Sequence, residues 1–142
     1  MPMITEWADE ERSIIVTTSE GAWTWNEYHH ALEEVIQMAE TVDHRVDLIN
    51  VALMNAKSPP GSGMPHYQRA MKSLPANISM MVMANRSILV KAIFNVFGKL
   101  RGSSAGNALK MAAARSMQEA FEIIQKDRQK EPFTKISPDP AT

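Results

Sequence analysis

The sequence predicts an α/β domain with a five-stranded, mixed and mainly parallel sheet flanked by about four helices. Its 142 residues match the size of one domain with its own apolar core. Short apolar runs of strand length alternate with longer segments of helical periodicity, as in successive βα units. We therefore expect a single domain over residues 1–130 and a flexible, Pro-containing tail at 131–142.

Two short segments near the start of the chain favour β-structure. Residues 4–8 and 13–18 are rich in apolar and β-branched side chains, and the acidic segment 9–12 separates them. A short polar turn between two such segments predicts an antiparallel pair of strands.

The clearest helix start in the sequence lies at Thr24. Thr24 and Glu27 have the spacing of a capping box, and Trp23 and Tyr28 stand where a hydrophobic staple would join them. Apolar residues then recur at helical spacing, so we expect this helix to continue to about Val42.

The middle of the chain predicts two buried strands, each followed by a helix. Residues 46–54 and 78–84 are short, mostly apolar runs, typical of strands covered on both faces, and the first should lie at the sheet centre. A loop rich in Pro and Gly at 55–65 leads to a short helix at 66–73, and a more apolar helix should occupy 87–100.

The segment from 103 to 130 admits two interpretations. Its Ala, Leu and Lys content suits one long helix. Ser116 and Glu119, however, repeat the capping-box spacing and indicate a fresh helix start. We expect a last strand at 110–114 and a final helix over about 117–128, with the long helix as the alternative.

Composition narrows the class of protein. The formal net charge of −1 does not suggest a nucleic-acid partner, and the absence of cysteine excludes disulfides and thiolate chemistry. No apolar run reaches the length of a membrane span, so we expect a cytoplasmic protein without a transmembrane segment.

Acidic residues dominate positions 1–50, whereas none occurs from Leu48 to Gln118. Such segregation favours an anionic ligand, an acidic partner or head-to-tail contact with another copy of the chain. The alternative is unevenly distributed solvated charge.

Two motifs in this order of elements resemble the STAS-like, SpoIIAA-like family over about residues 4–128. They are Gly21-x-Trp23-Thr24-Trp25-x-Glu27-Tyr28 at the first helix and Val42-Asp43-His44-x-Val46-Asp47 before the central strand. The family includes anti-sigma-factor antagonists, and a related branch is similar to CRAL-TRIO lipid-binding domains. The resemblance implies the sheet described above and a regulatory or lipid-binding role.

The resemblance also implies a possible phosphorylation site. In the antagonists a serine after the central strand is phosphorylated, and Ser62, followed by Gly63, is the nearest match, with Ser58 second. The acidic residue that precedes this serine in the antagonists is missing, and the loop is longer. An ordinary loop serine or a local helix cap is the alternative for Ser62.

The carboxyl edge of the predicted sheet is the first candidate site. Ligands of open parallel sheets collect at this edge, near helix N-termini that favour anions. The residues expected there, as a site for an anionic or phosphate-bearing ligand, are Lys57, Ser58, Ser62, Arg86, Ser87 and Arg115. The alternative is that these cations are merely solvated loop residues.

The apolar helix expected at 87–100 is the second candidate site, because its apolar face is wider than packing on one sheet requires. A neighbouring helix of the same chain, a homodimer interface or a lipid surface could cover it. The interface residues would be Leu89, Ile93, Phe94 and Phe97.

The methionines fall into two groups, one expected in the core and one around the loop at 55–65. Met80, Met81 and Met83 should fill the core. The methionines around the loop rich in Pro and Gly either line an adaptable apolar pocket or belong to the core as well, and these are Met54, Met64 and Met71.

No catalytic or metal-binding pattern stands out. The adjacent residues His29 and His30 point about 100° apart on a helix, so they cannot share one metal ion. No phosphate loop or nucleophile elbow is present, and we expect neither metal nor cofactor. The sequence therefore favours a non-enzymatic binding or regulatory module that contacts a regulatory protein or a small anionic ligand. A lipid-binding module is the alternative, and an enzyme using His66 or Ser62 is a distant third.

Overall fold

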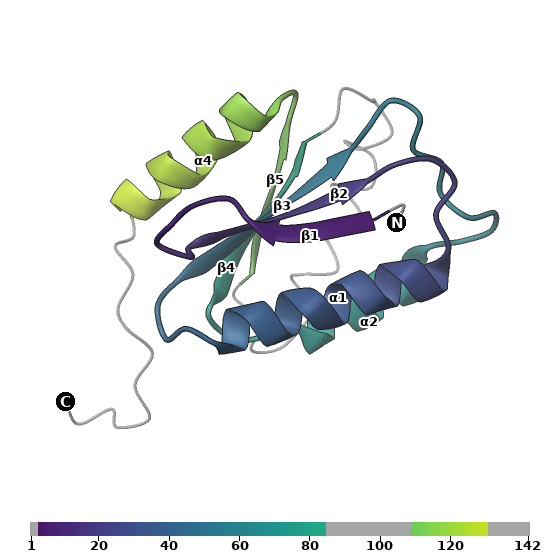
Figure 1. Ribbon diagram of the computed structural model, residues 1–142. Coiled ribbons are helices and arrows are strands. Elements are labelled where there is room, and N and C mark those ends of the chain that lie inside the picture. Colours follow the sequence, from purple (N-terminus) through teal and green to yellow (C-terminus); the bar gives the residue numbers. More distant parts are fainter. Residues whose placement is uncertain (1–2, 85–108, 131–142) are drawn as a thin grey trace.

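The computed structural model describes residues 3–84 and 109–130 and confirms the predicted α/β class (Figure 1). Its elements are β1 (Met3–Trp7), β2 (Ile14–Ser19), α1 (Trp25–Glu40), β3 (Val46–Ala52), α2 (Met64–Ser73), β4 (Ile78–Ala84), β5 (Lys110–Ala114) and α4 (Met117–Lys130). All five predicted strands are present, and three helices lie within the described residues.

Two predictions fall outside these ranges. The expected helix at 87–100, with Leu89, Ile93, Phe94 and Phe97, lies outside the described residues, as does the tail at 131–142.

The long-helix alternative for 103–130 is wrong, because residues 110–114 pair with β4 as a strand.

The five strands lie in the sheet in the order in which they follow along the chain. β1 runs antiparallel to β2, and all later neighbours are parallel. The predicted antiparallel pair is therefore confirmed, and β3 is the central strand as expected. Four parallel strands place their carboxyl ends along one edge of the sheet.

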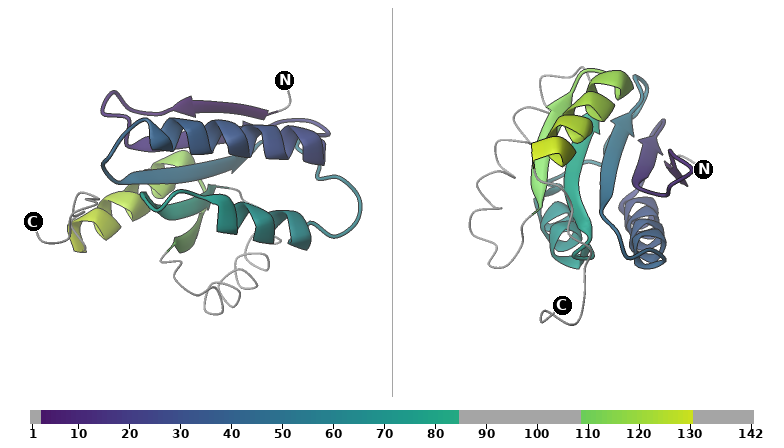
Figure 2. Two further views of the ribbon diagram at one scale, coloured as in Figure 1. Left: turned by 90° about the horizontal axis from the view of Figure 1, so that it is seen from below. Right: turned by 90° about the vertical axis from the view of Figure 1, so that its left-hand side faces the viewer.

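Helices cover both faces of the sheet. Figure 1 and Figure 2 show α1 and α2 on one face and α4 on the other. Since successive strand side chains point to opposite faces, each strand supplies both layers of the core. Ile15, Leu48 and Met81 pack beneath α1 and α2, whereas Val16, Ile49 and Val82 pack beneath α4. This double burial explains why the first half of β2 and most of β3 and β4 are apolar.

The start of α1 is built as the sequence predicted. Thr24 Oγ1 accepts a hydrogen bond from Glu27 N at 3.1 Å, and Glu27 Oε1 accepts one from Thr24 N at 3.0 Å. The rings of Trp23 and Tyr28 stack with centroids 5.9 Å apart, which completes the staple. Backbone hydrogen bonds of Lys57 with Gly21 and Trp23 then tie the loop after β3 to this helix start.

A buried ionic network fastens α4 to the sheet at the opposite end. The Asp47 side chain has no exposed surface and lies 3.0 Å from Arg45 Nη2 and 2.7 Å from Arg128 Nη2. Asp127 on α4 accepts hydrogen bonds from Arg45 and from Lys110 on β5. Burial raises the pKa of Asp47 although two guanidinium groups oppose this shift. The network holds α4 in place over β3 and β5.

Candidate ligand cavity

A largely apolar cavity of about 640 Å³ lies between the sheet and the helix pair α1 and α2. Its lining includes Ser19, Ala52 and Met83, which lie at or next to the carboxyl ends of β2, β3 and β4. Its walls are side chains such as Leu32 and Val35 of α1 and Ala70 and Met71 of α2. The loop after β3 forms its rim through Leu53, Met54, Ala56, Lys57 and Ser58. Cavities of this size take small organic ligands.

The floor of the cavity changes from apolar to polar along the strands. On β2 the buried residue Ile15 is followed on the same face by Thr17, and on β3 Leu48 is followed by Asn50. Thr17 and Asn50 are direct register partners, and Thr5 of β1 lies opposite Thr17 on the other side. We call Thr5, Thr17 and Asn50 the polar row, of which Thr17 and Asn50 line the cavity.

The hydrogen-bonding groups of the polar row are poorly used within the protein. Thr17 is only 6% exposed, and within the described residues neither its Oγ1 atom nor that of Thr5 has a hydrogen-bond partner. Asn50 Nδ2 donates to the sulfur of Met81 at 3.0 Å, and a thioether is a weak acceptor. A buried hydroxyl without a partner costs free energy, so this row is an unusual feature of the core.

An aromatic cluster joins α1 to α2 beside the cavity. The Trp25 ring stacks on His66 with centroids 3.9 Å apart, and His29 Nε2 lies 2.8 Å from His66 Nδ1. Tyr28 and Tyr67 pack edge to face at 5.7 Å and both line the cavity. Burial raises the pKa of both phenols, so both stay uncharged at neutral pH.

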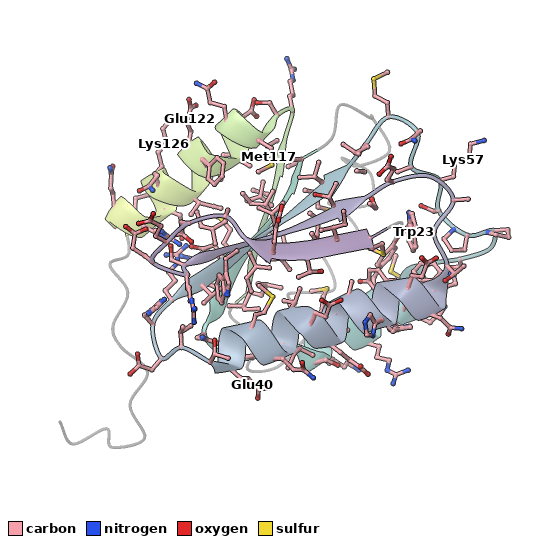
Figure 3. The ribbon with its side chains drawn as sticks, in the orientation of Figure 1. Trp23, Glu40, Lys57, Met117, Glu122 and Lys126 are labelled. Atoms are coloured by element: carbon pink, nitrogen blue, oxygen red, sulfur yellow. The ribbon has the colours of Figure 1, made fainter. Side chains whose placement is uncertain are left out.

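The structure places the predicted anion-site residues at separate points. Lys57 and Ser58 lie together at the cavity rim. Figure 3 shows Trp23 below the loop that carries Lys57, and the Lys57 side chain points outward from that loop. Arg115 follows β5, which is two strands away from β3. The bridge between Lys57 and Ala22 carries Lys57 toward β2 and so away from Arg115.

Three predicted residues need separate mention. Arg86 and Ser87 lie outside the described residues. The exposed Ser62 accepts a hydrogen bond from Met64 N at 3.3 Å, a local contact in the loop just before α2, whose N-cap residue is Gly63. Phosphorylation of Ser62 stays a prediction.

Sequence reasoning pointed to part of the cavity and missed the rest. Met54 and Met71 do line it, as the pocket interpretation of the methionines expected, whereas Met64 is not among the lining residues and packs against the core. Thr17 and Asn50 were not singled out. Each is a polar residue in a largely buried strand, but Thr18, Ser19 and Asp47 are polar residues of the same strands, so the pattern alone does not mark the positions that face the cavity.

Other classes of site find little support in the part of the chain that the structure describes. No three His, Asp or Glu side chains within it gather as metal ligands. No helix within it is long and apolar enough to cross a bilayer. Neither a protein-family model, a curated protein nor a solved structure matches the chain.

Proposed function

We propose that this protein is a non-enzymatic binding module that holds a small, mainly apolar molecule between the sheet and the helices α1 and α2. The cavity of about 640 Å³ is the observation that carries this proposal. The proposal follows the lipid-binding alternative of the sequence analysis, in which the fold resembles CRAL-TRIO-like domains. Lys57 and Arg115 lie beyond strands that are not neighbours, so a cationic edge gives weaker support to an anionic ligand.

The rim supports the same proposal, because it combines apolar side chains with access to solvent. Met54 is fully exposed and Leu53 is 41% exposed, and both line the cavity. Exposed apolar residues at a cavity entrance favour the passage of an apolar ligand over that of a charged one.

A fluorescent hydrocarbon tests the proposal directly. Diphenylhexatriene has no hydrogen-bonding group and becomes strongly fluorescent in an apolar site, so titration should show saturable binding to the wild-type protein. Ala70→Phe and Ala31→Phe fill the cavity from different helices, and each should weaken binding by about tenfold or more, a loss of about 1.4 kcal/mol. Ala76→Phe is the matched control, because Ala76 is exposed and does not line the cavity.

Absence of saturable binding by the wild-type protein would overturn the proposal. So would unchanged binding by both filling variants with native circular dichroism spectra. Native mass spectrometry of the purified protein adds a second measurement, because a retained ligand appears as an added mass.

The regulatory interpretation stays a second proposal, with Ser62 as phosphate acceptor and a homodimer formed through the predicted helix at 87–100. Its support is the resemblance to STAS-like antagonists and the exposed position of Ser62 before α2.

A further inference from the structure

We propose that the cavity selects an uncharged amphiphile, a molecule with a long apolar body and one hydroxyl or carbonyl group that hydrogen-bonds to Thr17 and Asn50. This inference rests on the proposed function and names the class of ligand. Three properties of the cavity carry it: an unpartnered hydroxyl, an exchangeable amide and the lack of a counter-charge.

The Thr17 hydroxyl is the first property. Thr17 lines the cavity and is 94% buried, and its Oγ1 atom has no hydrogen-bond partner among the described residues. Protein atoms enclose this oxygen in the rotamer that the structure shows. Rotation of the Thr17 side chain about χ1 to another staggered rotamer would bring Oγ1 to the cavity, where it can contact a ligand. A ligand group that accepts or donates one hydrogen bond would remove the cost of leaving this hydroxyl unsatisfied.

The Asn50 amide is the second property. Asn50 is the register partner of Thr17 on the neighbouring strand and lines the same cavity. Its Nδ2 atom donates to the thioether sulfur of Met81, which a ligand oxygen can replace with a stronger acceptor. Side chains directly opposite on adjacent strands lie close enough to hold one small polar group between them.

The charge of the lining is the third property. Among the described lining residues no Asp or Glu occurs, and Lys57 is the single basic side chain. Lys57 stands on the rim in the loop after β3, and its side chain points outward from that loop (Figure 3). Thr17 and Asn50 lie within β2 and β3. A carboxylate or phosphate seated on the polar row would therefore be buried without a counter-charge, which is far more costly than burying a hydrogen-bonded hydroxyl or carbonyl.

The test compares two ligands with the same alkyl chain. Dodecanol and dodecanoate compete with diphenylhexatriene at a pH of about 8, where the carboxylate is ionised. We expect dodecanol to displace the probe at a concentration about tenfold lower than dodecanoate. Equal or better displacement by dodecanoate would overturn the inference.

Variants of Thr17 and Asn50 test whether these two side chains cause the preference for dodecanol. Thr17→Val and Asn50→Leu should each weaken dodecanol binding by about tenfold and leave the binding of diphenylhexatriene close to that of the wild type. Thr17→Ser keeps the hydroxyl and should retain the preference for dodecanol. Thr18→Val is the matched control, because Thr18 is next along β2 and points to the opposite face.

The two proposals fail in distinguishable ways. If the wild-type protein does not bind diphenylhexatriene, the proposed function is wrong and this inference falls with it. If diphenylhexatriene binds but Thr17→Val and Asn50→Leu bind dodecanol as the wild type does, the cavity is a ligand site and only the assignment of the uncharged polar group is wrong.

Discussion

The Nε2 atom of His29 on α1 lies 2.8 Å from the Nδ1 atom of His66 on α2. One of these nitrogens must donate a proton and the other accept it, so the contact requires at least one neutral imidazole. Trp25 stacks on His66 with an angle of 5° between the rings. Because α1 and α2 form the walls of the cavity, this contact couples the protonation of two side chains to the integrity of the candidate site.

We expect the free energy of unfolding to decrease as the pH falls below about 6.5. Burial first, and then the charges of His66 and Arg69, lower the pKa of His29. Between the ordinary pKa and this lowered value the unfolded chain binds the proton more readily than the folded protein does. The contribution of His29 is therefore complete above about pH 6.5 and is lost as the pH falls toward the lowered pKa.

Urea unfolding at a series of pH values checks this dependence. His29→Gln should show a shallower decrease than the wild type over the same interval. His30→Gln is the matched control, because His30 is exposed and contacts only Glu34 among the described residues. A His29→Gln profile as steep as that of the wild type would contradict the assignment.

Gly63→Ala should destabilise the aromatic cluster. A Cβ atom at position 63 would stand 2.6 Å from Tyr67 Cε2 and 2.9 Å from Trp25 Cη2, so both rings would have to move. Such overpacking costs about 1–3 kcal/mol. Urea unfolding followed by tryptophan fluorescence measures the loss, and Gln68→Ala, at an exposed position of α2, should stay close to the wild type.

Removal of the central carboxylate of the ionic network should be among the most damaging single changes. Asp47→Ala leaves Arg45, which is 5% exposed, without one of its two carboxylate partners, and such a loss costs about 3–5 kcal/mol. The double variant Asp47→Leu with Arg45→Met removes both charges and should be less destabilised than Asp47→Ala. Equal destabilisation of the single and double variants in urea would argue against an unpaired buried charge as the cause.

Thr24→Ala should remove the capping box of α1 at a cost of about 1 kcal/mol. The hydroxyl of Thr24 is the acceptor for the Glu27 amide, so hydrogen exchange at that amide should become faster. Asn26→Ala, in the same helical turn and exposed, provides the control. Unchanged exchange at the Glu27 amide would show that this cap contributes nothing to the helix start.

Local signals predicted most of the secondary structure, because the responsible residues are close in sequence. The capping box at Thr24 needs only a spacing of three residues. The same spacing at Ser116 and Glu119 separated β5 from α4, and Glu119 N does donate to Ser116 Oγ at 3.1 Å. The start of α2 was placed two residues late, because Pro65 was read as part of the loop. Proline is tolerated in the first turn of a helix, where its missing N–H has no partner to lose.

The candidate site was harder to predict, because it depends on contacts between distant segments. His29 and His66 are 37 residues apart, and only the packing of α1 against α2 brings them into contact. Thr17 and Asn50 meet through the register of β2 and β3, which the apolar pattern alone does not fix. The sequence indicates more clearly that Asp47 takes part in an ion pair, since a charged residue within a buried strand requires a partner. Arg45 could be inferred from proximity, but Arg128 could not.

The sequential order of the strands has a consequence for synthesis on the ribosome. Each of β2, β3, β4 and β5 pairs with the strand that the chain made before it, so no strand has to wait for a partner encoded far downstream. Closing a short loop costs less entropy than closing a long one. The sheet can therefore extend by one edge strand at a time as the polypeptide emerges. Because α4 is made after all five strands, it covers the face that holds Asp47 only after residues 117–130 have been synthesised.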